Sequence, residues 1–331
     1  MKRVRVAVAG AGMVSRHHLV AWSRCAEAEV VGIADPSPGA AASRAQEFSL
    51  TAVFDDAAKM LEVTRPDAID IAASHEAHGT LCDLAAERGV AILCQKPLAP
   101  TLDAARTIAA GVGDRVRLMV HENWRHRPYY RQIHDWSSAG AIGQLRHIVL
   151  VARSSGLLAG PDGNRPSLVR QPMLAGLDRL MIGEGLVHHL DVMTWLAGGL
   201  AMRAACVRHD VPAVRGESAA TMLLEDADGR TAIIDGDLAV PGASARIEDR
   251  LEIIGTEGSI RLDGETLTLV RSDAARSEIR YDLDDAYQRS YDAAIAHFAH
   301  ALLHDLPFET PADVHLRVLA LVEDAYRLAS R

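Results

Sequence analysis

The sequence predicts an N-terminal α/β domain with a doubly wound parallel sheet, followed by a C-terminal α+β domain with an open, mostly antiparallel sheet. Over residues 4–120, short apolar runs alternate with helical patterns, which is typical of parallel strands covered on both faces. Longer β-branched runs joined by hairpin-like turns follow. A length of 331 residues also corresponds to about two domains. We place the domains at 1–122 and 123–331.

The elements of the first domain follow from its apolar runs. Helical stretches rich in Ala, Arg and Glu separate these runs, so each run is expected to be a strand. The expected strands are Val4–Ala9, Glu29–Ala34, Ala52–Phe54, Ala68–Ala73, Ala91–Cys94 and Val116–Val120.

The second domain is expected to begin with a helix, Pro128–Ala139, and to contain another near Gly185–Leu196. Between and after them we expect strands at Leu145–Arg153, Met202–Arg208, Ser218–Glu225, Thr231–Leu238, Ile247–Ile254, Ser259–Leu262, Thr266–Val270 and Glu278–Leu283. Two helices close the chain: apolar residues recur at helical spacing from Tyr291 to Leu302, and Thr310–Pro311 marks the start of the last helix. Gly156–Arg165 is expected to be a flexible loop.

Charge and composition exclude several classes of protein. Asp and Glu number 44 against 35 Lys and Arg, a net charge of −9, and there is no basic block that would neutralise nucleic-acid phosphates. No apolar run reaches the roughly 20 residues of a membrane helix. The four cysteines show neither zinc-type nor disulfide-type spacing, which favours a reducing, cytoplasmic location.

A glycine-rich turn follows the first strand. In a dinucleotide-binding fold, the first glycine permits a tight turn and the second lets the backbone approach the pyrophosphate. The third position, Ser15, is small enough for close packing and offers a hydroxyl that could donate to a phosphate. The helix N-terminus beyond it supplies amide donors. The candidate cofactor-binding residues here are Gly10, Gly12, Met13, Val14 and Ser15.

Asp35 ends the second strand, about 20 residues after Ser15, where the dinucleotide fingerprint places an acidic residue. A carboxylate there accepts hydrogen bonds from the ribose hydroxyls and repels a 2′-phosphate. Asp35-Pro36-Ser37 has no adjacent arginine to bind such a phosphate. The sequence therefore favours NAD over NADP.

Lys96 follows the fifth strand, at the sheet edge where such folds bind ligands. With Lys2 and Lys59 it accounts for all the lysines of a chain that otherwise uses arginine. A lysine can polarise a substrate hydroxyl or exchange a proton, which an arginine cannot. The alternative is a surface loop lysine.

Glu184, His188 and Asp191 are spaced i, i+4 and i+7, so we expect them on one helical face, with His189 pointing elsewhere. An imidazole beside a carboxylate is a plausible general base for an alcohol. The spacing also permits a metal site, but no further strong ligands lie nearby in the sequence, and we predict no metal. A buried, hydrogen-bonded histidine is the structural alternative.

Polar residues follow two other strands. Asn123 and Arg125, after the sixth strand, are candidates to bind cofactor or substrate, or to brace the domains. His75 and His78, after the fourth, either line the cofactor site or begin a helix.

These motifs resemble the Gfo/Idh/MocA family of sugar and polyol dehydrogenases over the whole chain. The resemblance rests on GAGMVS with Asp35, His78 before AILCQKPLA, HENWRHRP, EGLVHHLD and LEIIGTEGSIRLD. It implies a Rossmann domain and a substrate domain whose sheet forms homodimers or homotetramers. It further implies a catalytic group of lysine, acidic residue and histidine, here Lys96, Glu184 and His188. Gln95, Glu184, Ser15 and Ser74 depart from the family pattern, with Gln95 and Ser74 still expected at the cofactor.

We therefore expect an NAD-dependent dehydrogenase that oxidises a sugar, polyol or related cyclic alcohol. In this hypothesis Lys96 and His188 polarise the alcohol and accept its proton, with either assignment of the two roles open, and Glu184 orients substrate or histidine. Lys96, Asn123, Arg125, Glu184 and His188 bind the substrate. The alternatives are a catalytically silent dinucleotide-binding regulator and a reductase of a non-sugar carbonyl on the same fold.

Overall fold

The computed structural model describes residues 3–330, which form two compact units. Unit 1 contains residues up to His126 together with Tyr287–Arg317, and unit 2 contains Arg127–Ala286 and the chain from Val318. The expected domain boundary after residue 122 assigned both C-terminal helices to the second domain. Residues 287–317 instead pack with unit 1, because the apolar stripe of the penultimate helix completes the core of that unit.

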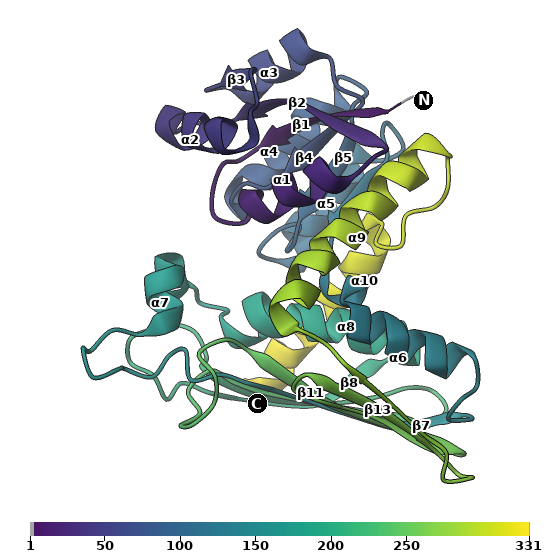
Figure 1. Cartoon of the computed structure of the whole chain (residues 1–331). Helices are drawn as coiled ribbons and strands as arrows, with labels where there is room; N and C mark the ends of the chain where they lie inside the picture. The colour runs from purple at the N-terminus through teal and green to yellow at the C-terminus, as the bar shows by residue number, and fades with distance from the viewer. Residues whose placement is uncertain (1–2, 331) are drawn as a thin grey trace. The chain divides into compact units, whose positions relative to one another are not determined.

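Unit 1 is built on a six-stranded, wholly parallel sheet with helices between its strands (Figure 1). Its strand order, β3-β2-β1-β4-β5-β6, is that of a Rossmann fold. The strands are β1 Val4–Ala9, β2 Ala28–Ala34, β3 Val53–Phe54, β4 Ala68–Ile71, β5 Ala91–Gln95 and β6 Leu118–His121. The helices are α1 Ser15–Arg24, α2 Pro38–Phe48, α3 Ala57–Thr64, α4 His75–Ala86, α5 Leu102–Val112 and the short 3₁₀ helix η1 Trp124–His126.

Helix α9 (Leu283–Leu303) runs from unit 2 into unit 1, where it supplies core residues. Phe298 is fully buried, meets Trp22 edge-on at 6.3 Å between ring centroids and stacks on Phe308 at 5.1 Å. Residue Thr310 then continues the edge of the sheet, since its backbone and side chain both bond Val120. The C-terminal segment is therefore an integral part of the Rossmann core.

Unit 2 is built on an eight-stranded sheet of order β14-β13-β12-β11-β7-β10-β9-β8, in which only the β7–β10 pair is parallel. Its strands are β7 Leu145–Arg153, β8 Ala201–Arg208, β9 Ala219–Glu225, β10 Thr231–Asp237, β11 Glu248–Gly255, β12 Gly258–Asp263, β13 Thr266–Arg271 and β14 Arg276–Arg280. Its helical segments are α6 Pro128–Ser138, α7 Pro166–Arg170, η2 Pro172–Gly176, η3 Met181–Leu186, α8 Val187–Ala197 and the end of α10 (Ala312–Ala329).

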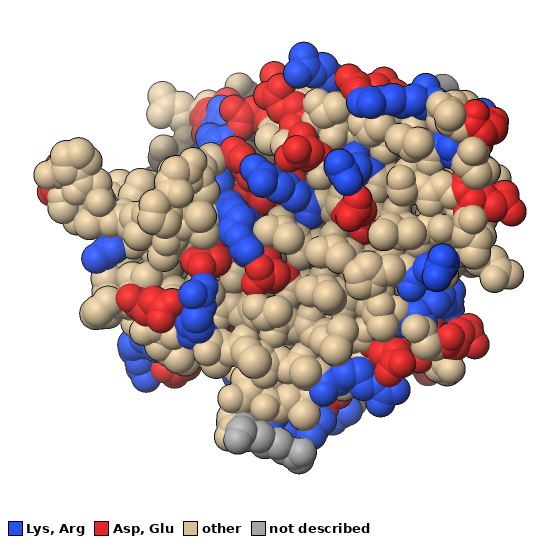
Figure 2. Space-filling model, turned by 90° about the horizontal axis from the view of Figure 1, so that it is seen from below, with Lys and Arg blue, Asp and Glu red and all other residues tan. Residues whose placement is uncertain are grey.

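One face of this sheet carries α6 and α8 (Figure 1). The helices cover only this face because apolar and partly exposed residues alternate along the strands. In β7, Ile148, Leu150 and Ala152 are buried, while the residues between them are partly exposed. Figure 2 views the other face, where a broad area of uncharged residues is surrounded by acidic and basic side chains. The mostly antiparallel sheet predicted from the sequence is confirmed.

Two local predictions need correction. The expected strand Glu278–Leu283 is observed as β14 at Arg276–Arg280, because Asp282 accepts the Asp284 and Asp285 N–H groups and starts α9 at Leu283. The helix expected near Gly185–Leu196 is not one continuous α-helix. It begins as the π-helix η3 and becomes α8 only at Val187.

In the part of the chain that the structure describes, none of the helices combines the length and apolar character required to cross a bilayer.

Candidate active site

The glycine-rich turn after β1 has the backbone geometry that a dinucleotide requires. Gly10 has φ +107°, and a Cβ there would lie 2.5 Å from the Ala72 carbonyl oxygen, so only glycine fits. A Cβ at Gly12 would contact nothing within 4 Å, so this glycine leaves room for a ligand rather than for protein packing. The first free amide groups of α1 lie at this turn, because Val14 is the N-cap of the helix. Met13, in the same turn, is exposed.

Ser15 has a different role from the one considered from the sequence. Its side chain is fully buried, and its hydroxyl donates to the Gly12 carbonyl at 2.7 Å. The hydroxyl therefore closes the turn from within, because this donation directs its proton into the protein.

Asp35 supports the same turn from β2. Its Oδ2 accepts the Ala11 N–H at 2.7 Å, and its Oδ1 accepts the Ser37 N–H at 2.8 Å. Each carboxylate oxygen keeps a second lone pair for a ribose hydroxyl. Arg44, on α2, reaches back to the Gly12 carbonyl at 3.2 Å and pairs with Glu47. This arginine lies nine residues beyond Asp35 and was not predicted to reach the turn.

His78 supports the turn that carries Lys96. It is 1% exposed, its Nδ1 lies 3.1 Å from the Pro97 carbonyl, and its Nε2 lies 3.2 Å from the Ala73 carbonyl. Burial lowers the pKa of this imidazole, although the carbonyls act in the opposite direction. His78 thus ties the end of β4 to the turn after β5. Ser74, the exposed N-cap of α4, and His75, paired with Glu76, lie beside it.

Lys96 follows β5, and a buried polar network lies under its backbone. The Lys96 N–H donates to Oε1 of Gln95 at 3.0 Å. The other end of the same amide reaches His18 at 2.7 Å and His121 at 3.2 Å. His18 in turn bonds Asp70 at 2.8 Å, with both side chains fully buried. The contact between His18 and Asp70 was not predicted, because 52 residues separate the two in the sequence.

Glu122, in the HENWRHRP motif, is a second buried group that was not among the predicted site residues. Its carboxyl is 1% exposed and accepts the Trp124 N–H at 2.9 Å. Burial raises its pKa, and the positive charge of Lys96 acts against that rise. A buried acid therefore lies close enough to Lys96 for the lysine charge to act on it.

Asn123 and Arg125 are buried within unit 1. The Asn123 amide donates to Ser290 Oγ at 2.7 Å, and Arg125 donates to the Glu309 carbonyl at 3.3 Å. Both residues therefore hold the C-terminal segment against the end of β6. Their contact with cofactor or substrate stays a prediction.

All of these unit 1 residues gather at one edge of the sheet. The strands are parallel, so the carboxyl ends of β1, β2, β4, β5 and β6 share that edge. The sequence-predicted groups that follow those ends are Gly10–Ser15, Asp35, Ser74–His78, Gln95–Lys96 and Asn123–Arg125.

The unit 2 candidates lie on η3 and α8. The first of these is a π-helix, whose turns are wider than those of an α-helix: the Gly185 N–H bonds the Leu180 carbonyl, five residues earlier. Glu184 is on this π-helical turn and is partly exposed, whereas His188 and Asp191 on α8 are 7% and 1% exposed. Such turns are frequent at functional sites.

Glu217 and Tyr326 hold η3 in place. The buried Glu217 carboxylate accepts the Leu180 and Ile182 N–H groups at 3.3 and 2.8 Å. The Tyr326 hydroxyl donates to Glu217 at 2.5 Å and accepts the Gly183 N–H at 3.2 Å. Burial raises the pKa of Tyr326, and the Glu217 charge raises it further, so the phenol remains a donor.

His189, which was expected to point away from the face of Glu184 and His188, bonds Asp249 of β11 at 2.8 Å. Tyr130 donates to the same carboxylate at 2.8 Å, and Arg127 lies 3.6 Å from it. Burial alone would raise the pKa of Asp249, but the charge and hydrogen bond of His189, with Arg127, bring it well below its usual range. This cluster anchors α8, which carries His188, to β11.

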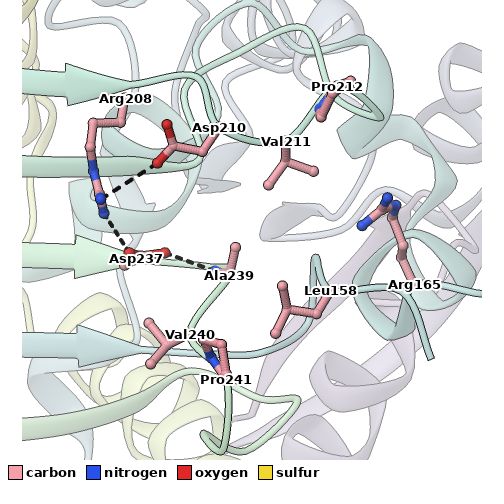
Figure 3. A pocket seen from close by; sticks show the side chains of 10 residues that line it. All are labelled: Leu158, Arg165, Arg208, Asp210, Val211, Pro212, Asp237, Ala239, Val240 and Pro241. Atoms are coloured by element: carbon pink, nitrogen blue, oxygen red, sulfur yellow. Dashed lines mark hydrogen bonds and ion pairs between the residues drawn. The ribbon is translucent and has the colours of Figure 1, made fainter. Parts of the chain in front are cut away.

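A separate cavity of about 460 Å³ lies at the end of β8 and β10 and contains none of the predicted site residues. Arg208 there pairs with Asp210 and Asp237, while Arg165 projects toward the hollow from the loop (Figure 3). Since Arg208 already has two acidic partners, this cavity does not replace the sites above as the candidate active site.

Comparisons with known proteins agree with this architecture. Residues 4–121 match the model of an oxidoreductase family with an NAD-binding Rossmann fold, and residues 130–261 match the GFO/IDH/MocA C-terminal domain. The chain is 32% identical to a D-apiose dehydrogenase of Paraburkholderia graminis, over 98% of this chain and 88% of that protein. An inositol 2-dehydrogenase of Rhizobium meliloti is 24% identical, over 98% and 96%.

Among solved structures, an oxidoreductase from Agrobacterium radiobacter in complex with NAD⁺, L-tartaric acid and magnesium superposes with a TM-score of 0.92. The two share 26% identity, and the alignment covers 100% of this chain and 97% of that one. A levoglucosan dehydrogenase with a TM-score of 0.87 and 19% identity, over 99% and 98% of the two chains, supports the fold.

Proposed function

The chain belongs to the Gfo/Idh/MocA family of NAD-binding oxidoreductases, and we propose that it oxidises a secondary or anomeric alcohol of a sugar, polyol or related cyclic compound. The observation that carries the proposal is the position of Lys96. It follows β5 at the sheet edge that also holds the glycine-rich turn and Asp35.

Unit 1 is suited to NAD. The open space at Gly12 and the α1 amides would receive the pyrophosphate, and Asp35 would accept the adenosine ribose hydroxyls. When bound, NAD supplies the acceptor for the hydride that leaves the alcohol carbon. The protein's own tasks are then to orient the alcohol and to remove its hydroxyl proton.

We assign these tasks to Lys96, His188 and Glu184. The Lys96 ammonium binds and polarises the reacting oxygen, and the His188 imidazole accepts the hydroxyl proton as the carbinol becomes a carbonyl. Glu184 orients either the substrate or the imidazole. The π-helical turn supports this assignment, since Glu217 and Tyr326 fix the backbone from which Glu184 projects. Asn123 and Arg125 are assigned to the edge of the same site.

A panel assay tests this function. The purified chain is incubated with NAD and separate sugars and polyols, including D-apiose, inositol and L-tartaric acid, and reduced cofactor is followed by its absorbance. Turnover with at least one cyclic polyol or sugar is expected. NAD binding by calorimetry without turnover on any member would favour the non-catalytic regulator, and turnover only with carbonyl compounds and NADH would favour the reductase.

We further propose a homodimer or homotetramer formed through the outer face of the unit 2 sheet. Ile233 lies in register between Val149 and Leu223 on this face, and Leu223 is 38% exposed. Val149 and Ile233 are partly exposed, and an aligned apolar row that solvent reaches is typical of an interface. Light scattering after gel filtration should give a dimer or tetramer that Leu223→Arg weakens, whereas a monomeric wild type would contradict the proposal.

We assign the protein to the cytoplasm. Its four cysteines are free thiols in the structure, three of them buried, and this state fits a reducing compartment. Fractionation of the source cells should recover it with cytoplasmic enzymes, and recovery in an exported fraction would contradict the assignment.

A further inference from the structure

Glu27, His300 and His304 form a cluster on the surface of unit 1, away from the candidate active site. Glu27 lies in the turn between α1 and β2, and the two histidines lie at the C-terminal end of α9. We propose that this cluster is a binding site for a zinc-type divalent transition metal, with Zn²⁺ as the reference ion. It is a structural site that fastens the end of α9 to the Rossmann sheet.

The distances are already close to those of a metal site. Nδ1 of His300 lies 3.2 Å from both carboxylate oxygens of Glu27, and Nε2 of His304 lies 3.5 Å from one of them. One ligand atom from each residue lies within 4.8 Å of the others. Two ligand atoms bound tetrahedrally at zinc bond lengths are separated by about 3.4 Å. Small side-chain rotations would therefore bring all three onto one ion.

The chemistry of the ligands selects the class of ion. Imidazole nitrogen with carboxylate oxygen suits zinc and its neighbours, whereas magnesium and calcium prefer oxygen alone. His300 and His304 are spaced i, i+4, so one face of the helix presents both rings, whose centroids are 4.4 Å apart. The site also lies at a helix C-terminus, where the backbone carbonyls favour a cation.

The location explains what the ion would do. The cluster adjoins the amino end of β2, at the opposite edge of the sheet from Asp35 and Lys96. Its ligands come from two segments about 270 residues apart in the sequence. The helix they would fasten contributes Tyr291, Ile295 and Phe298 to the core of unit 1. Bound metal would therefore raise the thermal stability of unit 1 without changing turnover.

Titration of the full, tag-free chain with ZnCl₂ tests this inference by calorimetry and thermal unfolding. We expect one zinc per chain and a thermal midpoint that rises with zinc but not with MgCl₂. His300→Ala should weaken zinc binding at least tenfold and abolish the zinc-dependent rise in the thermal midpoint. Glu27→Gln should weaken zinc binding and reduce that rise. His209→Ala, which removes an exposed histidine of unit 2, is the matched control and should leave both unchanged.

Equal zinc affinity in wild type and His300→Ala would overturn the inference, as would the absence of a zinc-dependent rise in the wild type. Because the site is structural, dehydrogenase activity before zinc addition should be the same in wild type and His300→Ala.

Discussion

Nε2 of Gln95 lies 2.7 Å from Nε2 of His18. The Lys96 N–H donates to the amide oxygen of Gln95, so the amide NH₂ is the end that faces the imidazole, and that ring nitrogen must accept. The ring proton of His18 therefore lies on Nδ1 and is donated to Asp70 at 2.8 Å. One amide thus fixes the tautomer of a fully buried histidine while it holds the backbone of Lys96.

Gln95→Glu should make the stability of unit 1 depend on pH in a new way. The introduced carboxylate needs a donor from His18, whose other nitrogen already donates to Asp70, so the ring must become an imidazolium. A histidine whose pKa is higher in the folded state than in the unfolded state stabilises the folded state. This stabilisation is complete below the unfolded pKa, near 6.5, and is lost as pH rises through the folded pKa.

The check is thermal unfolding of both proteins between about pH 6 and pH 9. The variant's midpoint should fall further below that of the wild type as pH rises. A difference in midpoint that stays constant over this range would show that Gln95 does not determine the protonation of His18.

Asp35→Asn should shift cofactor preference toward NADP. The substitution removes the charge that repels a 2′-phosphate, while the amide oxygen can still accept the Ala11 N–H. Arg44, which reaches the same turn, would then be available to attract the phosphate. The ratio of kcat/KM for NAD to that for NADP is expected to fall by about tenfold or more, a change of ~1.4 kcal/mol. An unchanged ratio would remove Asp35 from cofactor discrimination.

Asp249→Asn should destabilise unit 2 by about 3–5 kcal/mol at neutral pH, because it removes the buried negative charge that lies 3.6 Å from the buried Arg127 guanidinium. The pKa of Asp249 is lowered in the folded state. The stabilisation from this carboxylate is therefore present above its unfolded pKa of about 3.9 and is lost as pH falls through the folded value.

Denaturant unfolding of wild type and Asp249→Asn at several pH values measures this contribution. The stability difference should be constant near neutrality and should narrow below about pH 4. A difference that stays the same down to acid unfolding would contradict the lowered pKa.

Tyr326→Phe should lower kcat while leaving the KM for NAD unchanged. The variant removes the acceptor of the Gly183 N–H, which is a direct bond to η3. It also removes a donor from Glu217, the carboxylate that holds the start of η3, so the position of Glu184 is less well fixed. The free energy of unfolding should fall by about 1–3 kcal/mol. Steady-state kinetics in which NAD and the alcohol are varied in turn gives kcat and the two KM values separately. A fall in kcat accompanied by an equal rise in both KM values would indicate general disorder of the protein and not a loss of Glu184 positioning.

The sequence was sufficient for the features whose signals are local. Apolar runs located every strand of the parallel sheet, and the glycine-rich turn with Asp35 identified the dinucleotide edge. In each case the physical requirement, such as burial or a positive φ, acts on neighbouring residues.

The features that the sequence missed depend on distant partners. The π-helical turn is stabilised by Glu217 and Tyr326, which lie 35 and 143 residues from the groups they bind. The stripe from Tyr291 to Phe298 predicted an amphipathic helix, but no periodicity says which sheet the stripe covers. The charged edge strand at Arg276–Arg280 has no apolar alternation, so its register could not be read.

Single-turnover hydride transfer in Lys96→Ala and Lys96→Arg, with NAD affinity measured on the same samples, tests whether Lys96 takes part in the reaction. We expect NAD affinity close to that of wild type and a hydride-transfer rate lower by about 10²–10⁴-fold in Lys96→Ala. Substantial recovery in Lys96→Arg would indicate that the charge polarises the alcohol while His188 accepts the proton, and no recovery would exchange the two roles. A near-normal rate in Lys96→Ala would contradict the assignment of Lys96 to the chemistry.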